Sequence, residues 1–466
     1  MRVGEKDLYN KEKEEVAEAA VVTMPTKVAW DGPDDTLNPY NWPSSRKVSI
    51  AIIISLGQLV CLMTTSIVAP ALPQIAKDLG LGDSETQMSF SIFILGQGFG
   101  SLLIGPLSEL FGRKPVWVGC TLFFILWNSL CPVGKSKAVL IVGRFLGGAG
   151  GSCGVVLSGP IIADMYPGKD RGKSLAIATL FPYLGPAIGP IVVVVVSGMF
   201  IIHESCKPII LQYKAARLRK QGVPVAADGP SSSLLSKIVV GLSRPIQLLT
   251  TRLVIQLLAL IIALAFGTYV LVLSFFARVF INQYGQSATS SSLQYIAIAL
   301  GSTLSTQAGG RLMDFIYARL HDRQPEGASA LPEFRVPLIL LGGFLLPTGL
   351  FWLGWSAQGH VHWIMVDIGA MIFTVGDFLA SQAVLAYILD EFPTHAASAG
   401  AAARMVSNIL GFVFPLFAPQ LYDGLGYGLG NSLLAFVWIV VALPVAVALW
   451  FSGDKIRRVG RSQQDA

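Results

Sequence analysis

The chain has 466 residues, of which 53% are hydrophobic and only 13% are charged. A soluble fold does not bury apolar surface in that proportion, so the composition indicates a polytopic membrane protein. The net charge of +6 does not indicate nucleic-acid binding, because the Lys and Arg residues lie in loops beside apolar segments, where such residues orient membrane helices.

Residues 1–46 are polar and mix both signs of charge, so we expect a cytoplasmic tail and not a cleavable signal peptide. The tail ends in Asn-Pro-Tyr-Asn-Trp-Pro over residues 38–43. Indole rings favour the boundary between lipid and water, so Trp42 is expected to anchor this segment at the membrane surface.

Eleven apolar runs are long enough to cross a bilayer. They cover residues 48–69, 88–107, 115–133, 139–162, 174–202, 253–276, 291–309, 336–355, 364–388, 401–422 and 430–451.

A short loop between the second and third runs carries the most specific signal. It contains Gly105, Glu109, Gly112, Arg113 and Lys114, and its glycines allow a tight turn at the membrane surface. This spacing resembles the signature loop of major facilitator superfamily transporters. The resemblance implies an all-α fold of two six-helix halves, in which the loop gates the cytoplasmic side. We expect Asp164, after the fourth run, to pair with Arg113 or Lys114, and Arg171 to belong to the same gate.

Arg144 lies near the start of the fourth run and is followed by a glycine-rich stretch over 147–151. A charge inside a membrane segment usually faces a wet cavity or a partner. The sequence Arg-Phe-Leu-Gly-Gly resembles the family motif whose Arg is implicated in proton coupling. The alternative is an interfacial Arg that only packs.

The fifth run, 174–202, is too long for one span and too short for two, which would need roughly 40 residues. Its Gly185-Pro186 and Gly189-Pro190 resemble the kink motif of the antiporter branch, which implies a seal against leak and favours export. The end of the run resembles the sixth helix of the family. We interpret the run as helices five and six fused by a deletion. An eleven-helix protein or a re-entrant segment is the alternative.

Charge placement favours the deletion. Arg46, Arg113 and Arg171 fall on alternate connections and share the cytoplasmic side, whereas the basic residues of the second half do so only if six spans precede them. The predicted organisation is a cytoplasmic tail over 1–46, a membrane half over 47–203, a cytoplasmic linker over 204–251, a second membrane half over 252–452 and a cytoplasmic tail over 453–466.

The second half contains one ionisable residue near the middle of a span, Asp377, with Gln382 about one turn further on. Such a residue is a functional-site hypothesis by default, here a proton carrier or a cation contact, unless it only lines a cleft. Asp367 is nearer the end of the span and is expected to be interfacial. Gly310, Asp314 and Arg319 repeat the spacing of the signature loop, which indicates an internal repeat.

Several second-half stretches resemble fungal drug:proton antiporters, among them Gly349–Ser356 and Gly411–Pro419. The resemblance implies a proton-coupled exporter of amphipathic organic compounds, such as drugs, toxins or secondary metabolites. We expect a monomer in the lipid bilayer of the plasma membrane, although a vacuolar membrane is also open. The alternatives are a carrier of polyamines or other small organic cations, and a non-transporting product of splicing or of a gene-model error.

We expect no enzymatic activity, no cofactor and no metal site. The five His residues never fall at metal-ligand spacing with a carboxylate, and the chain has no Gly-Lys-Ser/Thr phosphate loop. Transport would therefore draw its energy from a gradient.

Overall fold

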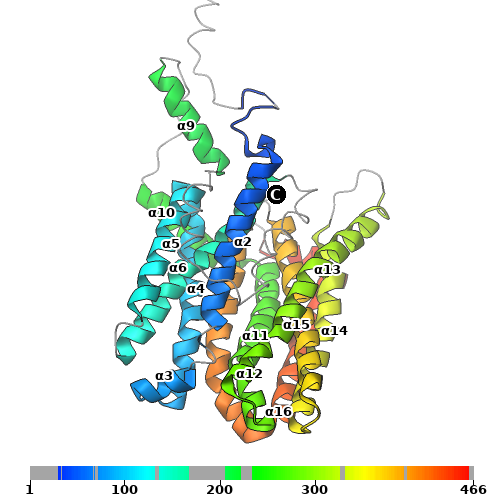
Figure 1. Cartoon of the computed structure of the whole chain (residues 1–466). Helices are drawn as coiled ribbons and strands as arrows, with labels where there is room; N and C mark the ends of the chain where they lie inside the picture. Colours follow the sequence, from blue (N-terminus) through cyan, green and yellow to red (C-terminus); the bar gives the residue numbers. More distant parts are fainter. Residues whose placement is uncertain are drawn as a thin grey trace, which may run out of the picture.

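The computed structural model describes residues 30–32, 34–66, 68, 72–131, 136–166, 205–221, 234–325, 331–392 and 396–460. Within these residues the secondary structure is helical, and the long helices stand side by side in one bundle (Figure 1).

The first half contributes four long helices, with a short helix, α3 (Leu72–Leu79), between the first two. The long helices are α2 (Ser44–Ser66), α4 (Asp83–Phe111), α5 (Arg113–Leu130) and α6 (Lys137–Met165). The fifth predicted run, 174–202, lies outside the described residues, so its interpretation as two fused helices stays a prediction.

The second half begins with α11 and continues through three further helices to α16, with a short α12 (Ala288–Leu293) before α13. The long elements are α11 (Leu253–Tyr284), α13 (Tyr295–His321), α14 (Val336–Gln358), α15 (Trp363–Glu391) and α16 (Ala396–Arg458). Gly426 adopts a φ of 72° inside α16, in the left-handed region that glycine tolerates, and divides it into two helices. The described residues of the second half thus form six long helices.

Ten of the eleven predicted runs coincide with these helices, which extend beyond the apolar residues into polar ends. By length and composition, seven described helices can cross a membrane, with the two parts of α16 counted as one. Helices α5 and α13 fall outside those seven but pack in the same bundle, α5 against α6 and α13 against α15.

The two halves meet where α4 packs against α16. Phe90 and Ile94 of α4 are fully buried and belong to the large apolar core of the second half. A Cβ at Gly411 of α16 would meet the side chains of Ile94 and Phe266, so a glycine there permits a close approach.

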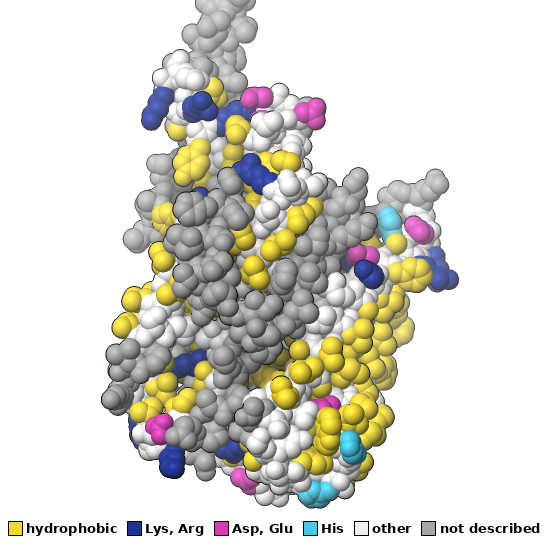
Figure 2. All heavy atoms as spheres, viewed as in Figure 1, with side chains coloured by type: hydrophobic (Ala, Val, Ile, Leu, Met, Phe, Trp, Pro, Cys, Tyr) yellow, Lys and Arg dark blue, Asp and Glu magenta, His cyan; other side chains and the backbone are white. Residues whose placement is uncertain are grey.

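The signature loop is reduced to one residue. Helix α4 ends at Phe111, α5 begins at Arg113, and Gly112 between them has a φ of 96°, which confirms the predicted tight turn. We call the end of the bundle that carries Arg113 and Arg335 the basic end, and the end near the α14–α15 turn the opposite end. In Figure 2, Lys and Arg gather mostly toward the top, and hydrophobic side chains cover the lower right flank.

The linker between the halves contains α9 (Lys207–Lys220) and α10 (Leu234–Thr251). The Nζ of Lys214 lies 2.7 Å from Asp31 and 3.2 Å from Asp35, so α9 is tied to the segment before α2. The pKa of Asp35 is held below its usual value by hydrogen bonds from the amides of Asp31 and Leu37, and then by Lys214.

Trp42 corrects one expectation from the sequence. Its side chain is buried in the first-half core with Ile50 and Met165, and the Arg46 guanidinium lies 4.0 Å from its ring centre. The indole therefore packs against protein, because the segment before α2 folds back onto α6.

Candidate functional site

The structure brings the signature loop together with the end of α6. The Nε of Arg113 lies 3.3 Å from Oδ2 of Asp164, and its Nη1 donates to the Ser108 hydroxyl at 2.6 Å. Ser205, just before α9, donates to the same Asp164 oxygen at 3.5 Å. The ion pair expected from the sequence is therefore present, and its basic partner is Arg113, which is almost fully buried.

The remaining gate residues divide into described and undescribed ones. Glu109 is exposed, Lys114 is half-buried, and Gly105 lies inside α4 with open space where a Cβ would be. Gly105 is therefore not required by packing. Arg171 lies outside the described residues. So do the four residues of the predicted kink, which are Gly185, Pro186, Gly189 and Pro190.

The second half carries a counterpart of this ion pair. The Nε of Arg335, just before α14, lies 2.8 Å from Asp390 at the end of α15, and its Nη1 lies 3.9 Å from Asp314. Arg319 instead lies over the Phe315 ring at 5.9 Å. The expected repeat therefore exists, but Arg335 and not Arg319 takes the basic position, because α13 continues to His321 without the one-residue turn.

Arg144 is buried where three helices of the first half meet. Its Nε donates to the Ser89 carbonyl of α4 at 3.4 Å, and its Nη1 donates to the Thr64 carbonyl of α2 at 3.2 Å. The guanidinium lies 4.6 Å from the Phe93 ring centre, and its Nη2 is buried without a hydrogen-bond partner. It is thus an interior charge and not an interfacial one.

Asp377 is also buried, with 3% of its surface exposed. Phe373 and Ala380, which share its face of α15, are fully buried in the second half. Its Oδ1 has no hydrogen-bond partner. Burial of an unpaired carboxylate is costly, so a proton or a bound cation on this group would relieve the cost. Asp377 lines neither of the two cavities described below.

Gln382 lies on a different face of α15, toward α13. Its amide donates to the Thr306 hydroxyl at 3.1 Å. One turn away on that face, Phe378 meets Tyr269 of α11 edge-on with ring centres 5.6 Å apart, and Tyr269 stacks on Phe266 at 6.4 Å. Three aromatic rings and an amide therefore lie in the middle of the second half.

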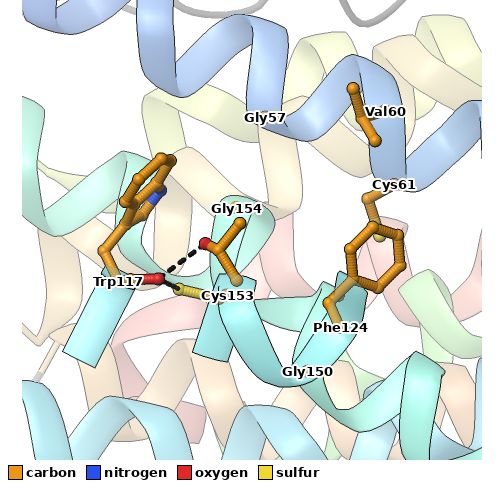
Figure 3. A pocket seen from close by; sticks show the side chains of 10 residues that line it. Gly57, Val60, Cys61, Trp117, Phe124, Gly150, Cys153 and Gly154 are labelled. Carbon is orange, nitrogen blue, oxygen red and sulfur yellow. Dashed lines mark hydrogen bonds between the residues drawn. The ribbon is translucent and has the colours of Figure 1, made fainter. Parts of the chain in front are cut away.

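A small cavity of about 30 Å³ lies between α2, α5 and α6 (Figure 3). Trp117, Cys61, Phe124 and the glycines around Gly150 line it, and the Cys153 thiol lies 4.0 Å from the Trp117 carbonyl. This volume is about that of one water molecule, so the cavity is a packing void and not a substrate site. A larger cavity lies at the opposite end, between α13 and α15.

The sequence reasoning missed a buried charge network at the basic end. Arg457 in α16 lies 2.8 Å from Glu333 and 3.4 Å from Glu391, and Arg252 lies 3.5 Å from Glu391. Each residue stands near the end of a predicted span, where the sequence indicates only orientation. The pairing depends on which span ends meet in space. Among the described residues, no cluster of His, Cys, Asp and Glu could hold a metal ion.

Comparison with known proteins agrees with this architecture. The Major Facilitator Superfamily profile matches residues 54–204 and 213–415. The xylose symporter XylE, bound to 6-bromo-6-deoxy-D-glucose, superposes with a TM-score of 0.62 at 17% identity, covering 91% of this chain and 99% of XylE. That likeness concerns the fold alone.

Two fungal relatives are similar over most of their length. A probable efflux pump, mfs2 of Aspergillus flavus, is 35% identical over 426 residues, 85% of this chain and 99% of the relative. An uncharacterized transporter of Schizosaccharomyces pombe is 35% identical over 473 residues, 96% of each chain. The chain belongs to the major facilitator superfamily of membrane transporters and is not an enzyme.

Proposed function

We propose that the chain exports amphipathic organic compounds, such as drugs, toxins or secondary metabolites, across the plasma membrane as a monomer in exchange for protons. The observation that carries the proposal is the match to a probable fungal efflux pump over 99% of that pump. The aromatic rings of Phe266, Tyr269 and Phe378 support it, because such rings bind large apolar groups without demanding one shape.

The proposal assigns roles to the residues predicted from the sequence. Arg113 and Asp164 form a gate at the basic end, which is cytoplasmic along with both termini. Arg144, Asp377 and Gln382 serve proton coupling or substrate contact. Gly185-Pro186 and Gly189-Pro190 shape a seal. The buried and unpaired atoms of Arg144 and Asp377 favour a coupling role, since interior charges of membrane segments are costly unless they are used.

We also propose that the chain is shortened within 174–202. The alignment with the Schizosaccharomyces pombe relative extends over 473 positions, more than the 466 residues of this chain, so that relative contains residues that this chain lacks. If the missing residues belong to helices five and six, this observation favours a second candidate function, namely that the chain is a non-transporting product of splicing or of a gene-model error.

Transport in proteoliposomes separates the candidates. We would compare the 466-residue chain with a version whose 174–202 segment is replaced by the corresponding segment of the Aspergillus flavus relative. With an acidic lumen, an antiporter accumulates rhodamine 6G inside, and an ionophore that collapses the pH gradient abolishes the accumulation. Accumulation by the restored version alone identifies a non-transporting product. Accumulation of spermidine but not of the dye would favour the polyamine carrier and contradict the proposed substrate class.

Coupling is tested in the version that transports. Asp377→Asn should abolish accumulation against a gradient and leave downhill dye movement and protein yield unchanged, because the amide keeps the shape but cannot take up a proton. Unchanged uphill accumulation would remove Asp377 from the coupling mechanism.

A further inference from the structure

A cavity of about 540 Å³ lies at the opposite end of the bundle, between α12, α13 and α15. This is within the range of small-molecule sites, roughly 300–1,000 Å³. The apolar part of its wall includes Leu300, Trp363 and Met371, and the polar part includes Gln286, Gln294 and Asp367. The site thus combines a large apolar wall with a few polar groups.

Asp367 is the charged residue among those that line the cavity. Its Oδ1 is buried and has no hydrogen-bond partner. The two amides are occupied with each other, since Gln294 donates to Gln286 at 3.1 Å. The nearby Tyr284 hydroxyl donates to the Val361 carbonyl at 2.7 Å. The cavity wall therefore carries one carboxylate, that of Asp367, with one of its two oxygens buried and without a hydrogen bond.

The face of α15 that lines the cavity runs on toward the centre of the second half. Asp367, Met371, Thr374, Phe378 and Gln382 are spaced four, three, four and four residues apart, which places them in a single stripe. Met371 lines the cavity, and Phe378 contacts the central Tyr269. Asp377 is off this stripe. The acid that meets the cavity is thus Asp367, which the sequence placed only at the interface.

We propose that this cavity binds the ammonium group of an amphipathic organic cation, with Asp367 as its counter-ion and Trp363 and the aliphatic wall against its apolar part. The proposal rests on the proposed export function and narrows its substrate class. One carboxylate matches a single positive charge, and an aromatic ring beside it adds a cation–π contact. A hard metal ion would instead require several oxygen ligands.

The test uses two probes of the same shape. One is a dansyl amide that carries a trimethylammonium-ethyl group, and the other is its uncharged 3,3-dimethylbutyl isostere. Binding to the purified full chain in lipid nanodiscs is followed by dansyl fluorescence. Asp367→Asn should weaken binding of the ammonium probe about tenfold and leave the neutral probe within about twofold, while Asp367→Glu should restore most of the difference.

Two controls keep the result interpretable. Asp423→Asn removes an exposed acid at the same end and should change neither probe. Leu300→Trp, at a position with 57% of its surface exposed, should fill the cavity and weaken both probes without a packing conflict. Equal effects of Asp367→Asn on the two probes, or no effect of Leu300→Trp, would overturn the proposed site.

Export of the two probes separates this inference from the proposed function. Wild-type export of the neutral probe, together with equal binding of both probes by Asp367→Asn, would contradict the cation site and keep the exporter. Charge-dependent binding without export of either probe would support the site and contradict the exporter.

Discussion

Arg144 holds a permanent positive charge at the end of α2. Thr64, whose carbonyl it contacts, is among the last four residues of α2 (Ser44–Ser66), where carbonyls lack a helical partner. A cation near this terminus is also favoured by the helix dipole. The contact with Ser89 ties the same guanidinium to α4. Arg144 therefore couples the position of α2 to that of α4 and α6.

Arg144→Lys tests this bridge. Lysine keeps the charge but lacks the planar fork that reaches two carbonyls at once. We expect accumulation against a gradient to fall at least about tenfold, while the downhill rate changes within about twofold, since one pH-coupled step and not the pathway is impaired. Paired uphill and downhill dye transport in proteoliposomes measures this. A parallel fall in both rates would indicate a merely structural role.

Helices α4 and α6 approach backbone to backbone at three glycines. A Cβ at Gly148 would collide with the carbonyl of Phe93, and one at Gly96 with the carbonyl of Phe145. Gly100 approaches the Ala149 carbonyl in the same way. Close backbone contact of this kind stabilises helix association by van der Waals packing, because the hydrophobic effect does not drive helices together within a lipid bilayer. Within the glycine run at 147–151, Gly148 thus permits the close contact with α4, whereas Gly150 and Gly151 face α5 and α2.

Gly148→Ala should destabilise the first half by about 1–3 kcal/mol, because the backbones must separate to accept the methyl group. Gly119→Ala is the matched control. Gly119 lies inside α5 with open space at its Cβ position, so alanine should stabilise by up to about 1 kcal/mol through helix propensity. Thermal unfolding of the two variants in the same detergent measures the difference. Similar melting temperatures would show that α4 and α6 are not held at this spacing.

At the scale of the whole molecule, the apolar runs predicted the helices, and the signature loop predicted the Arg113–Asp164 pair. The same reasoning could not decide which face of α15 each acid occupies. Asp367 and Asp377 are ten residues apart in α15. Only the packing of α15 against its neighbours shows that Asp367 lies on the stripe that lines the cavity and that Asp377 lies on the buried face. The sequence also could not show that Arg335, and not Arg319, is the basic partner in the second-half ion pair, because this depends on where α13 ends.

The internal repeat places one ion pair on each half at the basic end. Arg113 at the start of α5 pairs with Asp164 at the end of α6, and Arg335 before α14 pairs with Asp390 at the end of α15. Two such pairs at corresponding positions suit a latch between conformations more than a source of stability, because the cost of removing largely buried charges from water offsets much of their mutual attraction. Loss of either pair should therefore shift the population of an open state.

Cys206 supplies a native reporter for that shift. It is buried beside Ser205, which donates to Asp164, so opening of the Arg113–Asp164 pair should expose its thiol. We expect Arg113→Ala to raise the rate of maleimide labelling at Cys206 severalfold. This increase corresponds to a shift of about 1 kcal/mol in the equilibrium between the closed and open states of the basic end. Arg335→Ala should raise the labelling rate less, and the variant that carries both substitutions should raise it most.

Arg319→Ala, which removes a basic residue outside both pairs, should leave the rate unchanged. The charge swap that combines Arg113→Asp with Asp164→Arg should restore slow labelling if the pair itself is the latch. Peptide mapping by mass spectrometry isolates Cys206 from the other four cysteines. Unchanged labelling in Arg113→Ala, or fast labelling in the swapped variant, would show that the pair does not hold the basic end closed.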